Sequence, residues 1–206
     1  GCVVGEPTGM AVVLGHKGKH SFDVEVTGAE CHSAMAPLGV NAVEYAARLV
    51  TAISDIGRRL RTEGPFDPAY TVPHTTAHVG MLHGGTALNI VPRRARLVFE
   101  VRHLVRQPAE PLLAEIQAFA RDVLEPEMRQ VAPEAGIAFE RTSRIPGFDM
   151  PEDHAFVRFA AGLAGRGVAG KVSYGTEGGL FADHLGVPTV VCGPGDIAQA
   201  HKPDEF

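Results

Sequence analysis

The order of strand and helix patterns between residues 11 and 143 constrains the fold more than any other feature of the sequence. Apolar and polar side chains alternate in some segments, as in half-buried strands, and apolar side chains recur at helical spacing in others. These patterns predict strands at residues 11–27, 75–82, 95–104 and 136–141 and helices at residues 41–60 and 112–131. The resulting β-α-β-β-α-β order predicts a ferredoxin-like unit, in which a four-stranded antiparallel sheet carries both helices on one face. The opposite face of that sheet is bare unless something covers it.

The two flanking segments carry a different pattern, in which helices alternate with short apolar strands. Helices are predicted at residues 151–163 and 180–184, and strands at residues 172–174 and 189–192. The apolar run Cys2-Val3-Val4 fits the same sheet, so the flanks together have the alternation of an α/β domain. We therefore predict an α/β fold in which part of an α/β domain, residues 1–10 and 144–206, is interrupted by a complete ferredoxin-like insert, residues 11–143. We expect neither Gly1 nor Phe206 to be a natural terminus.

The composition indicates a globular chain and argues against several classes of partner. Of the 206 residues, 45% are hydrophobic and 21% are charged, which suits a packed core. The net charge of −5 favours neither nucleic acid nor an anionic membrane surface. No apolar run approaches the roughly 20 residues of a membrane span. The three cysteines are distant from one another in the sequence, which indicates reduced thiols and predicts a cytoplasmic protein.

Glu6 and His201 are candidate metal ligands near the two ends of the chain. Glu6 follows the predicted strand at residues 2–4, and His201 lies in a loop that contains Pro203. Ligands of open α/β sheets bind at the carboxyl ends of strands, and zinc accepts carboxylate oxygen and imidazole nitrogen. Each residue alone is also compatible with a turn-capping carboxylate or an ordinary loop histidine. A catalytic zinc site needs three protein ligands, so these two residues form only part of one.

Three residues of the insert are candidates for contact with a substrate. His32 lies in a loop of small residues after the first strand, from which an imidazole could donate a hydrogen bond to a developing oxyanion. Asn89 follows a Gly-Gly turn, and Arg102 lies late in the third strand, where its guanidinium suits a carboxylate. The alternatives are a satisfied loop histidine and a strand-edge arginine that faces water.

Taken in order, several short motifs resemble those of the co-catalytic dizinc aminoacylase and metallopeptidase family. That family includes acetylornithine deacetylase, succinyl-diaminopimelate desuccinylase and glutamate carboxypeptidase, and the sequence is most similar to the deacetylases. The motifs run through the whole chain: Gly5-Glu6-Pro7-Thr8, His16-Lys17-Gly18, His32-Ser33, Gly39-Val40-Asn41-Ala42, Thr71-Val72-Pro73, His83-Gly84-Gly85, Asn89, Arg102, Thr176-Glu177, Gly193-Pro194-Gly195 and Ala200-His201 through Glu205.

The resemblance implies a catalytic α/β domain with an inserted lid that pairs in a homodimer. Glu6 and His201 are each implied to bind one of two zinc ions, with cobalt as an alternative metal. His32 is implied to reach across the dimer into the partner's site and to steady the tetrahedral intermediate.

The resemblance also implies the substrate and the residues that contact it. The implied reaction is zinc-dependent hydrolysis of the amide bond of an N-acyl amino acid, as in the deacetylation step of arginine biosynthesis. Asn89 and Arg102 are implied to contact this small molecule from the lid, and Thr176 and Glu177 to line the pocket. Desuccinylation, carboxypeptidase-type dipeptide cleavage and a non-catalytic dimerisation module are the alternative functions.

The sequence departs from the family pattern at three places. The family's upstream His-x-Asp pair, bridging Asp and Glu-Glu pair have no counterpart in these 206 residues. We therefore expect this chain alone to hold zinc weakly or not at all and to be inactive. Cys31 stands where a small residue is usual, and residues 103–106 replace a proline-rich turn, so the identity of the substrate is open.

Overall fold

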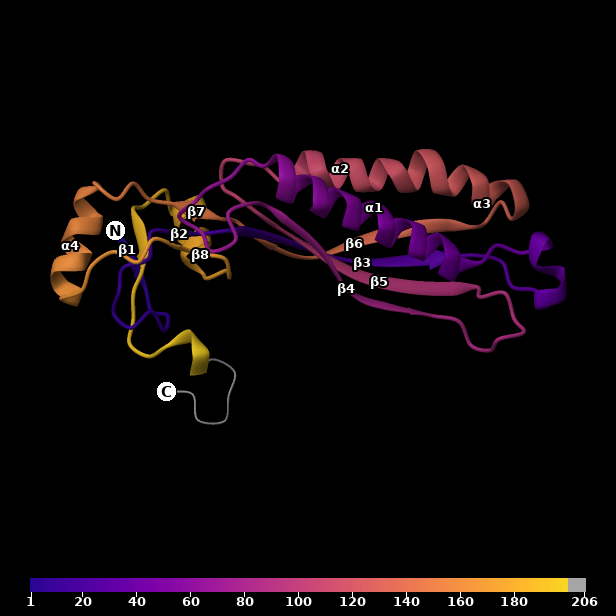
Figure 1. The fold of residues 1–206 in the computed structure, drawn as a ribbon, viewed down its shortest axis with the longest axis horizontal. Coiled ribbons are helices and arrows are strands. Elements are labelled where there is room, and N and C mark those ends of the chain that lie inside the picture. The colour runs from indigo at the N-terminus through magenta and orange to yellow at the C-terminus, as the bar shows by residue number, and fades with distance from the viewer. Residues whose placement is uncertain (200–206) are drawn as a thin grey trace.

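The centre of the molecule is a four-stranded antiparallel sheet that carries helices on one face (Figure 1). The computed structural model describes residues 1–199. The sheet has the order β4-β5-β3-β6, formed by β3 (Gly18–Thr27), β4 (Thr76–Gly84), β5 (Arg94–His103) and β6 (Gly136–Ile145). The helices of this unit are α1 (Ala42–Glu63), α2 (Glu110–Phe119) and α3 (Glu125–Val131). This is the strand order of the ferredoxin-like arrangement, so the predicted fold class is confirmed.

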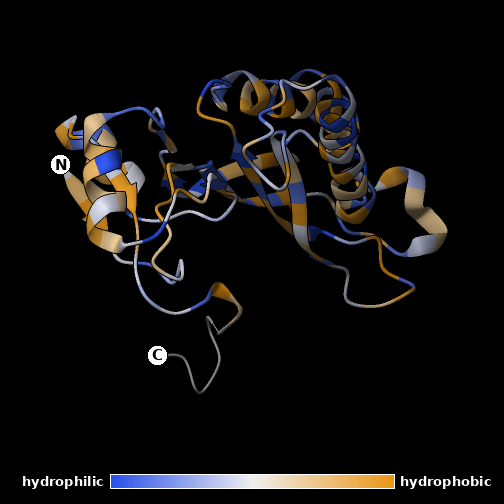
Figure 2. Cartoon of the chain, turned by 60° about the vertical axis from the view of Figure 1, so that its left-hand side comes forward, coloured by the Kyte–Doolittle hydropathy of each residue, from blue (hydrophilic) through white to orange (hydrophobic). Residues whose placement is uncertain are grey.

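The main core lies between the sheet and the helices, and the sequence pattern explains it. Apolar side chains of β3 and β5 point toward the helices and are buried, whereas the alternate residues point away. Helix α1 buries one stripe of residues spaced by three and four positions: Ala42, Ala46, Leu49, Ile53, Ile56 and Leu60. Figure 2 shows hydrophilic and hydrophobic residues alternating along these helices, as expected for amphipathic elements. Asn41 caps the start of α1 by accepting hydrogen bonds from two backbone N–H groups.

The second helix of the unit differs from its prediction. A single helix was expected at residues 112–131, but the structure begins two residues earlier, at Glu110, and contains a π-helical segment at Ala120–Leu124 between α2 and α3. Pro126 lies just after this segment and has no N–H to donate to the carbonyl of Asp122. The hydrogen-bond ladder is therefore interrupted there, and a π-helical turn accommodates the interruption.

The face of the sheet opposite the helices is polar. Arg96 forms a two-pronged ion pair with Asp23, and the Arg94 Nε lies 3.5 Å from Glu25 Oε1. Farther along the same face Glu100 contacts Arg102. This face was expected to be bare unless covered, and its paired charges make it suitable for contact with water.

The flanking segments form a smaller α/β unit at the end of β3 that is distant from the β4–β5 connection (Figure 1). Residues 12–16, which were assigned to the insert from the sequence, pack and pair with this unit. Strand β1 (Cys2–Val4) pairs in parallel with β9 (Thr189–Val191), and β2 (Gly15–His16) lies between β7 (Phe148–Asp149) and β8 (Lys171–Val172). Helices α4 (Ala155–Ala164) and α5 (Gly178–Leu185) complete this unit, together with the 3₁₀ turn Ile197–Gln199. The strand expected at residues 172–174 is shorter and lies one residue earlier. No helix within residues 1–199 is both long and apolar enough to cross a membrane.

His20 is a buried histidine whose protonation opposes folding. The residue is 2% exposed, and its Nδ1 has no hydrogen-bond partner among the described residues. Burial, reinforced by the nearby His103 and Arg141, lowers the pKa of His20 to about 4. The unfolded chain takes up this proton near pH 6.5, so the free energy of unfolding should fall between pH 6.5 and 4, by at most about 3 kcal/mol.

We therefore expect His20→Phe to flatten the loss of stability between pH 6.5 and 4. The free energy of unfolding should be measured by urea denaturation at several pH values in this range. His184→Phe is the matched control, because His184 is exposed and should leave the acid dependence unchanged. An unchanged slope in His20→Phe would contradict the assignment of this acid sensitivity to His20.

Candidate functional site

Glu6 lies at the carboxyl end of β1, among other acidic and phenolic side chains. Burial raises the pKa of the Glu6 carboxyl, and the carboxylate of Glu177 raises it further. Burial likewise raises the pKa of Tyr174, with added effects from Glu6 and Asp196. Three separate segments therefore lie close enough to affect one another's protonation: Glu6, the turn with Tyr174 and Glu177, and Asp196. They meet at the carboxyl ends of the parallel pair β1 and β9. That is the edge at which α/β sheets bind ligands.

The donors in this environment fit part of a metal site. Repulsion between the Glu6 and Glu177 carboxylates is the kind that a bound cation relieves, and carboxylate oxygen is a suitable zinc ligand. Within residues 1–199, however, no three or more His, Cys, Asp and Glu side chains are placed to hold a metal ion together. The second predicted ligand, His201, lies outside the described residues. The described part of the chain therefore supplies at most a fraction of the ligands that a catalytic metal needs.

Thr176 and Glu177 begin the turn that leads into α5. Thr176 is buried, and its hydroxyl accepts a hydrogen bond from the backbone N–H of Gly178 at 3.0 Å. Glu177 is exposed at the start of α5. His16 holds this turn in place, because its Nε2 accepts a hydrogen bond from the Gly179 N–H. The Nδ1 atom of the same ring lies 2.9 Å from the Lys17 carbonyl oxygen. These two contacts define a neutral ring with its proton on Nδ1, which is a structural role.

Arg102 lies at the end of β5 that adjoins the flanking unit. Its Nε donates to Glu100 Oε1 at 2.7 Å, and its Nη1 lies 3.5 Å from the Ser173 carbonyl oxygen. Arg102 is thus near the turn that carries Thr176 and Glu177. Glu100 was not predicted from the sequence, although its position two residues before Arg102 on the same strand places both on one face of the sheet.

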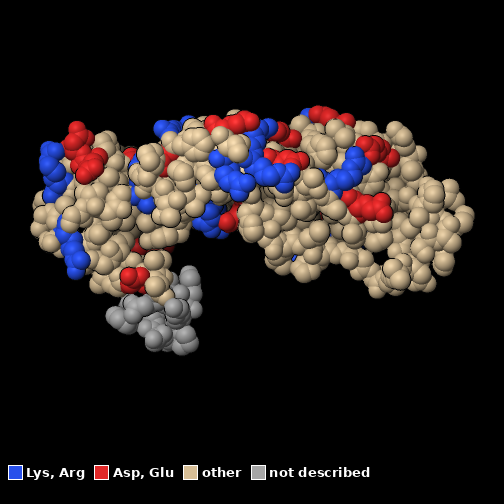
Figure 3. All heavy atoms as spheres, in the orientation of Figure 1, with Lys and Arg blue, Asp and Glu red and all other residues tan. Residues whose placement is uncertain are grey.

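His32 and Asn89 lie together at the opposite end of the sheet. Two backbone hydrogen bonds join their loops, from Ser33 N–H to the Asn89 carbonyl at 3.0 Å and from Val91 N–H to the Cys31 carbonyl at 2.8 Å. Both predicted site residues are exposed. We refer to this end, residues 28–40 and 85–93, as the lid tip. Figure 3 shows no lysine, arginine or acidic side chains at this end of the molecule in that view.

The imidazole of His32 is oriented by its own loop. His32 Nδ1 accepts a hydrogen bond from the Ala34 N–H at 3.1 Å, in the manner of a helix N-cap for the 3₁₀ turn Ser33–Leu38. A neutral imidazole that accepts at Nδ1 carries its proton on Nε2. His32 therefore presents an N–H donor to the solvent.

The predicted site residues thus form two groups that one chain does not bring together. Strand β3 has ten residues and leads from the flanking unit to the lid tip, a length of about 30 Å. Glu6, Arg102, Thr176 and Glu177 lie toward one end of this span, and His32 and Asn89 lie at the other. No side chain spans such a distance. Asn89 and Arg102 were both implied by the family resemblance to contact substrate from the lid, and the structure places them near opposite ends of β5.

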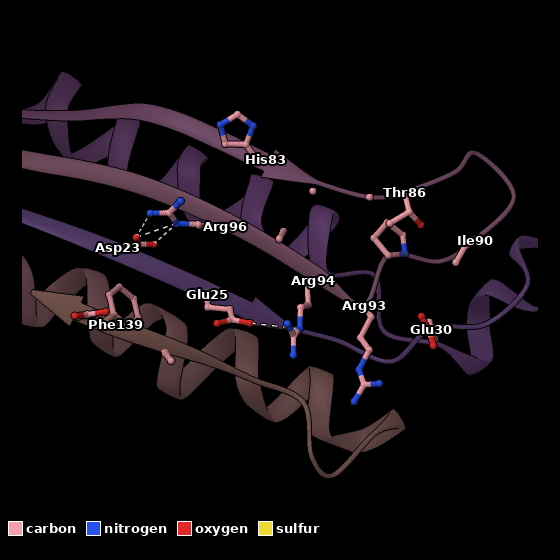
Figure 4. Close-up of a pocket in the computed structure, with 16 residues that line it drawn as sticks. Asp23, Glu25, Glu30, His83, Thr86, Ile90, Arg93, Arg94, Arg96 and Phe139 are labelled. Atoms are coloured by element: carbon pink, nitrogen blue, oxygen red, sulfur yellow. Dashed lines mark hydrogen bonds and ion pairs between the residues drawn. The ribbon is translucent and has the colours of Figure 1, made fainter. Parts of the chain in front are cut away.

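A groove of about 740 Å³ lies on the polar face of the sheet near the lid tip (Figure 4). Its walls come from all four strands of the sheet, the β4–β5 connection and the loop after β3, and include Glu30, His83 and Arg93. Arg94 and Arg96 also border it, but both are paired with carboxylates of β3. None of the predicted site residues lines this groove, so its size alone does not make it the active site.

Comparison with known proteins gives the family of the chain. The model of the peptidase dimerisation domain of the M20 family matches residues 14–128. Acetylornithine deacetylase from Photorhabdus laumondii is 33% identical over 204 residues, covering 99% of this chain and 51% of the relative. The enzyme of that name from Myxococcus xanthus is 35% identical, covering 99% of this chain and 52% of the relative. The chain therefore spans about half the length of the curated relatives it matches.

Solved structures show the same fold at lower identity. Aminopeptidase PepT from Bacillus cereus superposes with a TM-score of 0.67 at 24% identity, covering 92% of this chain and 46% of that chain. A tripeptidase from Staphylococcus aureus gives a TM-score of 0.63, with the same identity and coverage. The resemblance stated from the sequence motifs is thereby confirmed: the chain belongs to the M20 family of metallopeptidases and aminoacylases and carries that family's dimerisation domain.

Proposed function

We propose that the protein to which this chain belongs is a zinc-dependent, cytoplasmic deacetylase of N-acyl amino acids that acts in arginine biosynthesis. The observation that carries the proposal is the division of the site residues between the two ends of a dimerisation domain. In a symmetric dimer, the lid tip of one subunit can lie over the Glu6 end of the other. The similarity to acetylornithine deacetylases along the whole chain supports the same substrate class.

Each group of residues then has a distinct task. At the Glu6 end, Arg102 binds the carboxylate of the amino acid, and Thr176 and Glu177 shape the pocket. At the lid tip, the Nε2–H of His32 donates to the oxygen that becomes negatively charged as the amide carbon becomes tetrahedral, and Asn89 contacts substrate beside it. Glu6 and His201 would hold zinc or cobalt, which when bound polarises the carbonyl and lowers the pKa of a bound water.

Hydrolysis of N-acetylornithine by the complete protein tests this proposal. The release of ornithine should exceed the rates with N-succinyl-diaminopimelate and with dipeptides, and it should fall with a chelator and return with added zinc or cobalt. Faster desuccinylation or dipeptide cleavage would favour those alternatives. A stable dimer without any hydrolysis would favour the non-catalytic dimerisation module. The 206-residue chain alone should show no hydrolysis, because its described residues form only part of a metal site.

We further propose that β4 is the strand through which two lids pair. β4 and β6 are the edges of the sheet. β6 carries Glu140, Arg141 and Arg144, which discourage pairing with another strand, whereas β4 has no acidic residue, lysine or arginine. Met81 and Leu82 of β4 are exposed apolar residues beside a shallow groove between β4 and α1. A second β4 in that position would extend the sheet and cover them.

Leu82→Lys should therefore weaken the dimer, because it places a charge in the proposed interface. We expect the dissociation constant to rise at least about tenfold, the effect of losing one well-buried interface residue. Analytical ultracentrifugation over a dilution series measures it. Val123→Lys, an exposed apolar position of similar accessibility in the helical layer, is the control and should leave the dimer intact. Equal effects of the two substitutions would place the interface elsewhere.

A further inference from the structure

Arg102 is held by Glu100 along one edge of its guanidinium group. The Arg102 Nε donates to Glu100 Oε1 at 2.7 Å, and Nη2 lies 3.4 Å from Glu100 Oε2. A guanidinium is planar and carries five N–H donors, so one carboxylate on the Nε side leaves the Nη1–Nη2 edge for a second acceptor.

The second edge has only a weak partner. The Nη1 contact to the Ser173 carbonyl oxygen is 3.5 Å long, at the outer limit of a hydrogen bond. The hydroxyl of Ser173 is buried without a hydrogen-bond partner among the described residues. The residue whose carbonyl the free edge of Arg102 approaches therefore also carries an unsatisfied hydroxyl, as expected near a place where a further polar ligand binds.

Arg102 belongs to a cluster of cations with Lys17 and Lys19. Among the contacts between described residues, Glu100 is the only acidic side chain that approaches a member of this cluster. Lys19 Nζ lies 3.9 Å from Glu100 Oε2, and both Lys19 and Glu100 are about one-quarter exposed. Lys17 is fully buried nearby, where burial and then the charge of Arg102 lower its pKa to about 8. Without Glu100, repulsion from these lysines would favour movement of the Arg102 side chain away from the end of β5 that adjoins the flanking unit.

We propose that Glu100 is a positioning residue that fixes the guanidinium of Arg102 so that its Nη1–Nη2 edge faces the carboxylate of the substrate. This inference rests on the proposed function, since it assumes a substrate with a carboxylate. Glu100 itself does not touch the substrate. It sets the affinity for carboxylate-bearing substrates through Arg102 and leaves the chemical step to other groups.

The kinetic test compares N-acetylornithine with its α-carboxamide in the complete protein. Glu100→Gln keeps the shape of the side chain but removes its charge. It should raise KM for N-acetylornithine about tenfold, the range for a hydrogen bond to a charged group, with kcat within about twofold. KM for the carboxamide should not change. Glu100→Asp should restore part of the affinity, and Arg102→Lys should show the same selective loss as Glu100→Gln.

Asp23→Asn is the matched control, because Asp23 makes a comparable two-pronged pair with Arg96 on the same face of the sheet. It should leave both KM values unchanged. An unchanged KM for N-acetylornithine in Glu100→Gln, or an equal rise for the carboxamide, would overturn the proposal.

A second measurement does not depend on the substrate. In protein labelled with ¹⁵N-arginine, the Nε–H of Arg102, identified by its absence in Arg102→Lys, should exchange slowly with water. It should exchange faster in Glu100→Gln and stay slow in Asp23→Asn. If the wild type hydrolyses no N-acyl amino acid, the proposed function fails, and this exchange still decides the role of Glu100: unchanged exchange would refute positioning by Glu100.

Discussion

Turnover of the complete protein should fall by a factor of ~10²–10³ when His32 is replaced by alanine, the loss typical of one oxyanion donor. The Ala34 N–H fixes the His32 ring with its Nε2–H outward, and substitution by alanine removes that donor without altering a buried contact. The loss should appear mainly in kcat, because the negative charge on the oxygen develops only in the transition state.

His83→Ala is the matched control for this prediction. His83 is also an exposed histidine near the lid tip, but it belongs to β4 and lines the groove on the polar face of the sheet. Its substitution should change kcat by less than about twofold, as expected for a residue outside the transition-state contacts. A similar loss in both variants would mean that the lid tip is merely sensitive to substitution, and the role of His32 would be refuted.

The free energy of unfolding should fall by about 2–5 kcal/mol in Leu97→Ala, the range for a leucine truncated inside a packed core. Leu97 is 0% exposed at the centre of β5, where it packs in the cluster shared by the sheet and α1. Its removal leaves a cavity between two rigid layers that cannot close fully. Denaturant unfolding monitored by circular dichroism measures the loss.

Leu88→Ala is the matched control for this loss of stability. Leu88 carries the same side chain on the β4–β5 connection and is 101% exposed. Its truncation removes no buried contact, so the free energy of unfolding should change by less than about 0.5 kcal/mol. Similar losses for Leu97→Ala and Leu88→Ala would contradict the position of the core given by the structure.

The fold of the central unit could be predicted because each of its local signals agrees with the tertiary arrangement. The alternation of Phe22, Val24 and Val26 with Asp23 and Glu25 assigns both faces of β3, and the apolar spacing in residues 41–60 assigns the buried stripe of α1. The π-helical segment was missed because its cause is a single missing N–H at Pro126, which leaves the apolar periodicity almost unchanged.

The site was harder to predict because its parts depend on contacts between distant segments. Glu100 has the pattern of a solvent-facing strand residue, and only the geometry of Arg102 gives it a task. The residues of the two groups could be chosen one by one from family motifs. The separation between the two groups could not be predicted from those motifs, because it depends on the direction in which β3 leads away from the flanking unit.

The central claim is that the lid tip of one subunit completes the site at the Glu6 end of its partner, and hybrid dimers test it most directly. His32→Ala and Glu6→Ala subunits of the complete protein should each be nearly inactive alone. After random exchange, half of the dimers are hybrids, and each hybrid has one site with both Glu6 and His32 intact. The account predicts recovery to about a quarter of the wild-type activity. Exchange confirmed by mass spectrometry with activity no higher than that of the separate variants would contradict it.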